Sequence, residues 1–208
     1  MTSHADPSPS RGFHISLPDA FTALPLDDVE ASTDGGELTS SIAKQFGMTP
    51  DDDNAVAAAS AFAQLGSLIG DGGIDYAAMA FYKSPDDPLR PIMVTLAGIS
   101  MPSNHHTARE AINNLVELHS SSGADAVEEL RLPSGPAVAT VLEEHNALIV
   151  NGEPNHILTR QLSAWVPDRD GTTIGVVSVI TNSFQDWERV CVLGLEIFDT
   201  FGWEPLSG

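Results

Sequence analysis

Ser100 is the residue of this chain whose surroundings most resemble those of a catalytic nucleophile. The segment Gly98-Ile99-Ser100-Met101-Pro102 follows an apolar run and precedes a helical pattern, as the nucleophile elbow of an α/β-hydrolase does. The elbow requires a second glycine two residues after the serine, because it relieves crowding at the sharp turn, and Pro102 occupies that position. We therefore expect Ser100 to be an ordinary loop serine between a strand and a helix.

Seven histidines could provide metal ligands, but their spacing does not fit a site. His105 and His106 are adjacent, and adjacent residues of a helix point in different directions. The sequence contains neither His-x-x-x-His nor His-Glu-x-x-His. We expect His105 and His106 to be polar residues at a helix N-terminus and His119 to lie at the edge of the core, with no metal site.

The remaining cofactor motifs are incomplete. The glycines within 70–73 precede a strand pattern, whereas a dinucleotide-binding loop follows one. Lys44 and Lys83 are the only lysines, so the chain has no Gly-Lys-Ser/Thr phosphate loop. The segment from Asp168 to Gly171 has its glycine about two residues too early for a calcium loop and is typical of a hairpin turn. We therefore predict no catalytic, cofactor-binding or metal-binding residues.

The composition is that of a strongly acidic globular protein. The chain has 208 residues, of which 42% are hydrophobic, which is enough to bury a core. Nine Lys and Arg stand against 29 Asp and Glu, for a net charge of −20. Such a surface repels nucleic acids and anionic bilayers, so neither is expected as a partner. No apolar run approaches the roughly 18 residues of a membrane span, so no membrane insertion is expected.

The single cysteine indicates a reducing compartment. Cys191 cannot form an internal disulfide, and it lies in an apolar helical stripe, where it is expected to act as a small buried hydrophobic side chain. Residues 1–11 are polar and rich in Pro and Ser without an apolar core, which predicts a disordered lead-in rather than a signal peptide. We therefore expect a cytoplasmic protein.

Residues 12–208 are predicted to form one domain, because no linker rich in Pro, Gly and Ser interrupts them. This domain includes an acidic helical segment at 19–69. Between Asp19 and Asp53 the segment holds nine acidic residues against Lys44 alone. Its apolar spacing predicts a short helix marked by Leu38, Ile42 and Phe46, followed by an alanine-rich helix over 49–69.

Hydrophobic alternation predicts strands at 13–17, 74–82, 92–99, 127–132, 137–143, 157–166 and 172–181. Short links rich in Gly, Pro and Asp join most of these strands, which predicts antiparallel hairpins. Residues 146–155 are expected to be a loop, with 148–150 as an alternative strand. The strands at 74–82 and 92–99 are apolar on both sets of alternate residues, as in strands covered on both faces.

Two amphipathic helices are expected in the second half. Thr107 and Glu110 fit a capping box at the start of a helix that continues to about His119. A last helix begins near Ser183 and carries apolar residues on one face as far as Phe201. The predicted fold is therefore α+β, a largely antiparallel sheet covered by helices on both faces.

Four segments of the second half carry a resemblance to a known family. They are Leu132-Pro133-Ser134-Gly135-Pro136-Ala137-Val138, 162–167, 174–181 and 195–203. Their pattern of hydrophobic residues and turns resembles actinobacterial proteins that are in turn similar to the Mog1/PsbP-like α/β/α sandwich. In that family a final helix that ends in an aromatic residue packs across an antiparallel sheet. The resemblance covers residues 74–203, and the acidic residues 19–53 have no counterpart in it.

The resemblance implies that the protein acts by binding, because members of this family bind a GTPase, assemble photosystems or accompany secretion effectors. It implies no site residue. We expect a non-enzymatic protein-binding module whose sheet face or acidic rim docks a partner, and the negative charge favours a basic one. The same charge is also typical of ordinary solvated surface. Two alternatives are a secretion or assembly chaperone with an exposed apolar groove, and a small-molecule hydrolase in which an imidazole contacts Ser100 Oγ.

Overall fold

The computed structural model describes residues 11–24, 26, 36, 39–40, 43–44, 49–52, 74–87, 90–150 and 153–205, and only the backbone of 146–150 and 153–157. Residues 39–40 and 43–44 are helical, within the acidic segment. Leu38, Ile42 and Phe46, most of the helix expected over 49–69, and all but one residue of the lead-in 1–11 lie outside the described residues. Those expectations therefore stay predictions.

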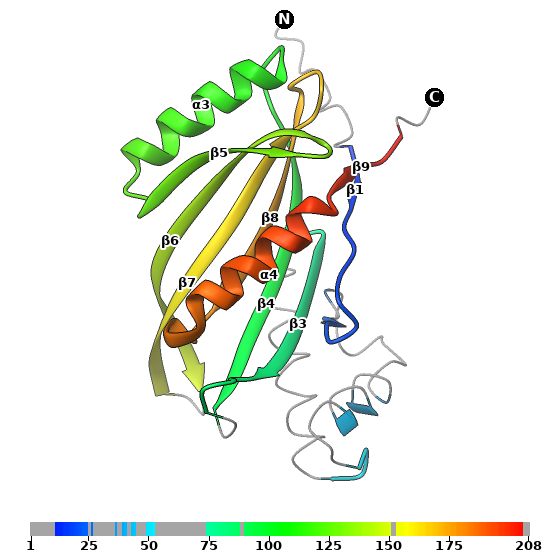
Figure 1. Ribbon diagram of the computed structural model, residues 1–208, viewed down its shortest axis with the longest axis vertical. Coiled ribbons are helices and arrows are strands. Elements are labelled where there is room, and N and C mark those ends of the chain that lie inside the picture. The colour runs from blue at the N-terminus through cyan, green and yellow to red at the C-terminus, as the bar shows by residue number, and fades with distance from the viewer. Residues whose placement is uncertain are drawn as a thin grey trace, which may run out of the picture.

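A seven-stranded antiparallel sheet forms the centre of the molecule (Figure 1). Its strands, in spatial order, are β2 (Thr22–Ala23), β3 (Tyr76–Lys83), β4 (Pro91–Pro102), β8 (Thr173–Thr181), β7 (Glu153–Pro167), β6 (Gly135–Val150) and β5 (Ala126–Leu132). Every neighbouring pair is antiparallel, which confirms the predicted hairpins.

The chain reaches this order through one crossover. After the β3–β4 hairpin, helix α3 (Ala108–Ser121) carries the chain from the middle of the sheet to its far edge. Strands β5 to β8 then return as a meander until β8 pairs with β4, where Ser100 lies opposite Gly175. Two boundaries differ from expectation: β6 continues through the segment expected to be a loop, and Ser100 lies within β4 rather than in a loop.

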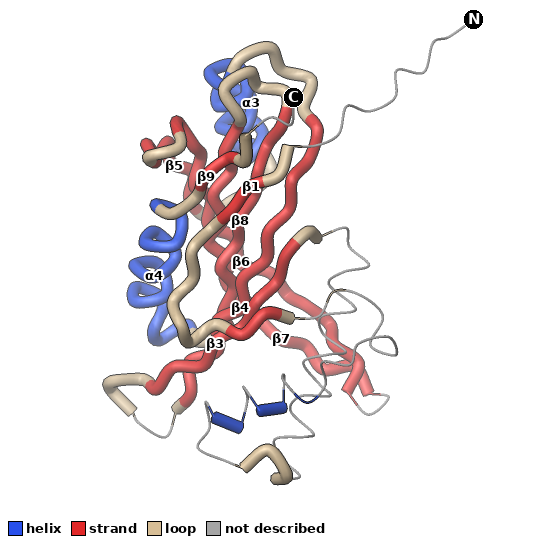
Figure 2. Tube along the Cα trace, turned by 90° about the vertical axis from the view of Figure 1, so that its right-hand side faces the viewer, coloured by secondary structure: helices blue, strands red, loops and turns tan. Residues whose placement is uncertain are grey.

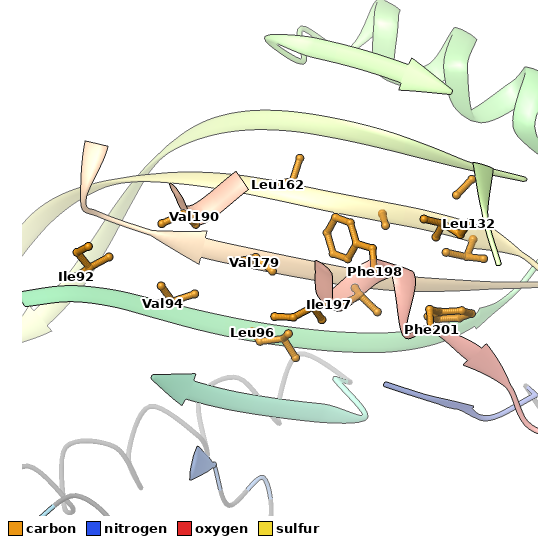
Figure 3. Packing of buried hydrophobic residues seen from close by; sticks show 14 residues of the cluster. Ile92, Val94, Leu96, Leu132, Leu162, Val179, Val190, Ile197, Phe198 and Phe201 are labelled. Carbon is orange, nitrogen blue, oxygen red and sulfur yellow. The ribbon is translucent and has the colours of Figure 1, made fainter. Parts of the chain in front are cut away.

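Helix α4 (Trp187–Asp199), preceded by the 3-10 turn η1 (Phe184–Asp186), packs across one face of the sheet (Figure 1). Phe198 and Ile197 point from α4 into a cluster with Val179 and Leu96 (Figure 3). Gly194 permits this close approach, because a Cβ there would lie 2.9 Å from Leu162 Cδ2. Full burial of each such apolar side chain stabilises the fold by about 1.5–3 kcal/mol.

Helix α3 packs on the opposite face. Alternate residues of a strand point to opposite sides of a sheet, so Val177 of β8 faces α4 while Val176 faces α3. Ile112 and Leu115 of α3 are buried against Val176. However, α3 lies at one end of the sheet only, whereas α4 crosses its middle (Figure 2). The described helices therefore leave most of the α3 face uncovered, so the predicted cover on both faces is not seen. The α+β antiparallel architecture is the part of the prediction that is confirmed.

The two ends of the described chain meet in a second, two-stranded sheet. Strand β1 (Phe13–His14) pairs antiparallel with β9 (Gly202–Trp203). The Phe13 ring stacks on Phe201 with 5.0 Å between ring centroids and meets Trp203 edge-on at 6.4 Å. The predicted strand over 13–17 is thus shorter than expected, although its alternate apolar residues do pack against the core.

Candidate functional site

A mostly apolar groove lies between α3 and the ends of β4, β7 and β8. Its volume is about 550 Å³, within the usual range of ligand sites. We call it the α3 groove and define it by nine lining residues: Met101, His105, Asn114, Leu115, Glu117, Leu118, Ser121, Trp165 and Ile174. Leu118 of α3 is 57% exposed beside this apolar lining. The groove therefore offers uncovered apolar surface.

The local sequence fixes the position of α3. Thr107 Oγ1 accepts from the Glu110 amide at 3.2 Å, as the predicted capping box requires. Glu110 Oε2 accepts from the His106 amide at 3.0 Å rather than from Thr107, so the reciprocal bond is shifted by one residue. Arg109 Nη1 adds an exposed ion pair of 3.0 Å to Glu129 on β5. The N-terminus of the helix is held against the sheet.

His105 is held at both ring nitrogens on the rim of the α3 groove. Ser103 Oγ lies 2.5 Å from Nδ1, and Asn114 Nδ2 lies 2.8 Å from Nε2. Because Nδ2 of an asparagine is a donor, Nε2 accepts and Nδ1 carries the proton that it donates to Ser103. In this arrangement the imidazole does not withdraw a proton from Ser103. The chain of three residues orients a polar group rather than activating a nucleophile.

His119 of α3 packs against Trp165, which lines the α3 groove. Their ring centroids lie 4.5 Å apart, and Trp165 Nε1 donates to Thr140 Oγ1 at 3.1 Å. Among the described residues, no partner forms a hydrogen bond with His119 Nε2, which is buried. Burial lowers the pKa of His119 below its ordinary value, because an unpartnered charged imidazole loses hydration. His119 is therefore at the core edge, as predicted, and in its neutral form.

Ser100 does not form the pair that a hydrolase would need. Its hydroxyl donates to the Arg11 carbonyl at 2.7 Å, and its amide donates to Asp75 Oδ2 at 2.6 Å. His14 lines the same cavity of about 500 Å³, but its ring lies over Gly202. Within the described residues no imidazole is hydrogen-bonded to Ser100. The hydrolase alternative thus lacks the contact on which it depends.

The other residues singled out in the sequence, among the described ones, take part in turns or in hydrophobic packing. Asp168 caps its own turn, accepting at Oδ1 from the Thr172 amide at 2.9 Å, as expected of a hairpin. Cys191 packs partly buried against the core, and burial raises the pKa of its thiol. Trp203 packs against the hydrophobic cluster under α4, and Trp165 packs against the cluster under α3. Across the described part of the chain, no group of three or more His, Cys, Asp or Glu could hold a metal ion.

Sequence reasoning missed two features. The contact of His105 with Asn114 follows from the fold of a loop onto a helix and has no sequence motif. The carboxylate of Asp186 is buried, although its position predicted an ordinary first-turn residue of the last helix.

No helix among the described residues is long and apolar enough to cross a membrane.

Comparisons with known proteins give little information on identity. No family model matches the chain, and no curated protein matches it. One similar solved structure is the crystal structure of LpqN, which is involved in cell envelope biogenesis of Mycobacterium tuberculosis. The similarity spans 97% of this chain and 88% of LpqN at 11% identity, with a TM-score of 0.39. A similarity of this size assigns neither a family nor a function.

Proposed function

We propose that the protein is a non-enzymatic binding module that holds an apolar segment of a basic protein partner in the α3 groove. The observation that carries this proposal is the apolar lining of the groove beside Leu118, a large side chain left 57% exposed. Uncovered apolar surface in a concave site is typical of places where proteins bind ligands or partners.

The charge of the chain favours a partner with basic residues around its apolar segment. The net charge is −20, and Glu117 lines the groove itself. Arg109, the cation of α3, is already paired with Glu129. Lysine or arginine next to the bound segment would therefore be attracted by Glu117 and by the net negative charge of the chain, which accelerates encounter in electrostatically steered complexes.

Two synthetic peptides test this proposal. Both carry a Leu-Trp-Leu centre, one flanked by lysines and the other by glutamates, and binding is measured by calorimetry at low and high salt. We expect saturable binding of the lysine peptide that weakens with salt, and about tenfold weaker binding by Leu118→Asp. Val192→Asp is the matched control, because Val192 on α4 is 58% exposed. Equal effects of the two substitutions, or no saturable binding, would contradict the proposal.

A secretion or assembly chaperone is the second candidate, and the same groove favours it. Such a protein would recognise the apolar centre of the peptide without regard to its flanks. Equal affinity for the lysine and glutamate peptides, with loss of both in Leu118→Asp, would identify this alternative.

The fold family and the compartment of the protein are also matters of proposal. We propose a Mog1/PsbP-like sandwich, supported by α4 packing across an antiparallel sheet and by the aromatic Phe201 that follows it.

We also propose a cytoplasmic location without nucleic acid as partner, supported by the single cysteine and the acidic charge. Fractionation of cells that express a tagged full chain tests the location, and a cell-envelope fraction would contradict it.

A further inference from the structure

Asn114 of α3 presents an oriented carboxamide to the α3 groove. The residue lines the groove and is exposed. Its Nδ2 donates to His105 Nε2 at 2.8 Å, and Ser103 Oγ lies 2.5 Å from the other ring nitrogen of His105. The loop before α3 thus holds the imidazole, and the imidazole holds the carboxamide in turn.

Part of the hydrogen-bonding capacity of this carboxamide is unused. An asparagine amide has two N–H hydrogens and an oxygen that accepts. His105 takes one of the hydrogens, and within the described residues no group bonds to the other hydrogen or to Oδ1. A donor and an acceptor in a fixed orientation therefore remain beside an apolar surface.

The length of the groove wall suits three residues of extended chain. Five residues of α3 form that wall: Asn114, Leu115, Glu117, Leu118 and Ser121. From the first to the last, the wall covers about two turns of helix, or roughly 10 Å. A strand rises about 3.3 Å per residue, so about three of its residues cover this length. Leu115 and Leu118 lie between the two ends, where they can contact apolar side chains of the segment.

We propose that the α3 groove binds its partner segment in an extended conformation and that Asn114 hydrogen-bonds the backbone of that segment. The N–H and C=O of one extended residue point to the same side, where a carboxamide can accept from the first and donate to the second. In a helix both groups are bonded internally. Asn114 would thereby select an extended partner at the site of the proposed function, on which this role rests.

His105 is a positioning residue in this arrangement. A side chain that is ordered only on binding costs about 0.5–1.5 kcal/mol, and a carboxamide that His105 already holds avoids part of that cost. The contact from Asn114 Nδ2 to His105 Nε2 exists without a ligand, so the groove carries its backbone-binding group in a preset orientation.

Ester analogues of the lysine-flanked peptide test this role, because an ester replaces one backbone N–H by an oxygen that cannot donate. Three analogues carry the ester at each residue of the Leu-Trp-Leu centre in turn, and calorimetry compares them with the parent peptide. We expect one analogue to bind about fivefold more weakly, the loss typical of one neutral hydrogen bond. Asn114→Ala should weaken the parent peptide by at least this factor and should bind that analogue and the parent equally.

Two further variants complete the experiment. Asn113→Ala is the matched control, because Asn113 is exposed on the same helix but does not line the groove, and it should leave the fivefold ester effect unchanged. His105→Phe should reduce the ester effect to about twofold, because a carboxamide that rotates freely forms the bond less often. An ester effect that His105→Phe leaves unchanged would contradict the positioning role of His105.

Binding of the parent peptide separates this role from the function proposed for the groove. Without saturable binding of the parent peptide, both fail. If the parent binds and Leu118→Asp weakens it, but all three esters bind as the parent does, only the recognition of the backbone is overturned. An ester effect that persists in Asn114→Ala, or tighter binding by the same sequence locked in a helix, would also overturn it.

Discussion

Asp186 and Arg90 form a charge-assisted hydrogen bond of 2.9 Å, from Nη2 to Oδ2, although 96 positions separate them in the sequence. The Asp186 side chain is fully buried at 0% exposure. Its other oxygen, Oδ1, accepts from Ser84 Oγ at 3.0 Å and from Arg189 Nη1 at 2.9 Å. One carboxylate thus joins the end of the β3–β4 hairpin to the start of α4.

The protonation of Asp186 follows from these partners. Burial by itself would raise the pKa of the carboxyl, but the hydrogen bond from Ser84 and the charge of Arg90, together with Arg189, hold its pKa below the ordinary value. The ionised form is therefore the one that the fold stabilises. A carboxyl with a lowered pKa stabilises the fold at neutral pH and loses this contribution as the pH falls below its ordinary value near 3.8.

Asp186→Asn should lower the thermal midpoint at about pH 7, because it leaves two arginines without their shared buried anion. The difference from the unaltered chain should shrink at about pH 3, because the unfolded chain there binds the proton that the folded carboxylate resists. Arg109→Gln, which removes an exposed ion pair, should cost only about 0.5 kcal/mol. Melting curves of the three proteins at both pH values check this, and equal loss in both variants would contradict a special role for Asp186.

Acidification should destabilise the protein through His119. The pKa of its imidazole is lowered in the folded state, so the neutral form is preferred there and the unfolded chain binds the proton first. The contribution is full above the ordinary pKa of 6.5 and is lost as the pH falls through the folded value. His119→Gln should therefore have a shallower fall of unfolding free energy between about pH 7.5 and pH 5.5 in urea titrations. An unchanged slope would show that other groups account for it.

Phe198→Ala should destabilise the fold by about 3–5 kcal/mol, because it opens a cavity beneath α4. Phe198 is 0% exposed and is among the largest fully buried side chains of the described residues. Val192→Ala on the exposed side of the same helix should change stability by less than about 0.5 kcal/mol. Chemical denaturation separates the two, and similar costs would argue against α4 packing as described.

Gly171→Ala should cost more than Gly123→Ala, although both glycines have positive φ, +75° and +87°. The left-handed conformation alone costs a non-glycine residue about 1–2 kcal/mol. At Gly171 an added Cβ would also lie 2.6 Å from the Thr107 backbone, whereas at Gly123 nothing lies within 4 Å. Because Thr107 caps α3, Gly171→Ala should in addition weaken peptide binding at the α3 groove. Denaturation midpoints and peptide titrations measure both effects, and equal costs would contradict the close approach.

Local sequence patterns were sufficient for most of the secondary structure. The positive φ of Gly171 in the turn that Asp168 caps, and the helix start at Thr107, rest on interactions between residues a few positions apart. Such interactions depend little on the rest of the chain, so the sequence alone is enough to predict them. The extension of β6 through 146–150 depends instead on pairing with β7, and a pairing partner is invisible in a single segment.

The sequence by itself determined the α+β composition of elements, their antiparallel hairpins and the strongly acidic charge, because these depend on local periodicity and on counts of residues. Only the tertiary structure decided which side chains meet. The α3 crossover lets β8 pair with β4, and Arg90, just before β4, then lies beside Asp186, just after β8. Contacts between distant segments are selected by the packing of the whole sheet, which no short pattern specifies.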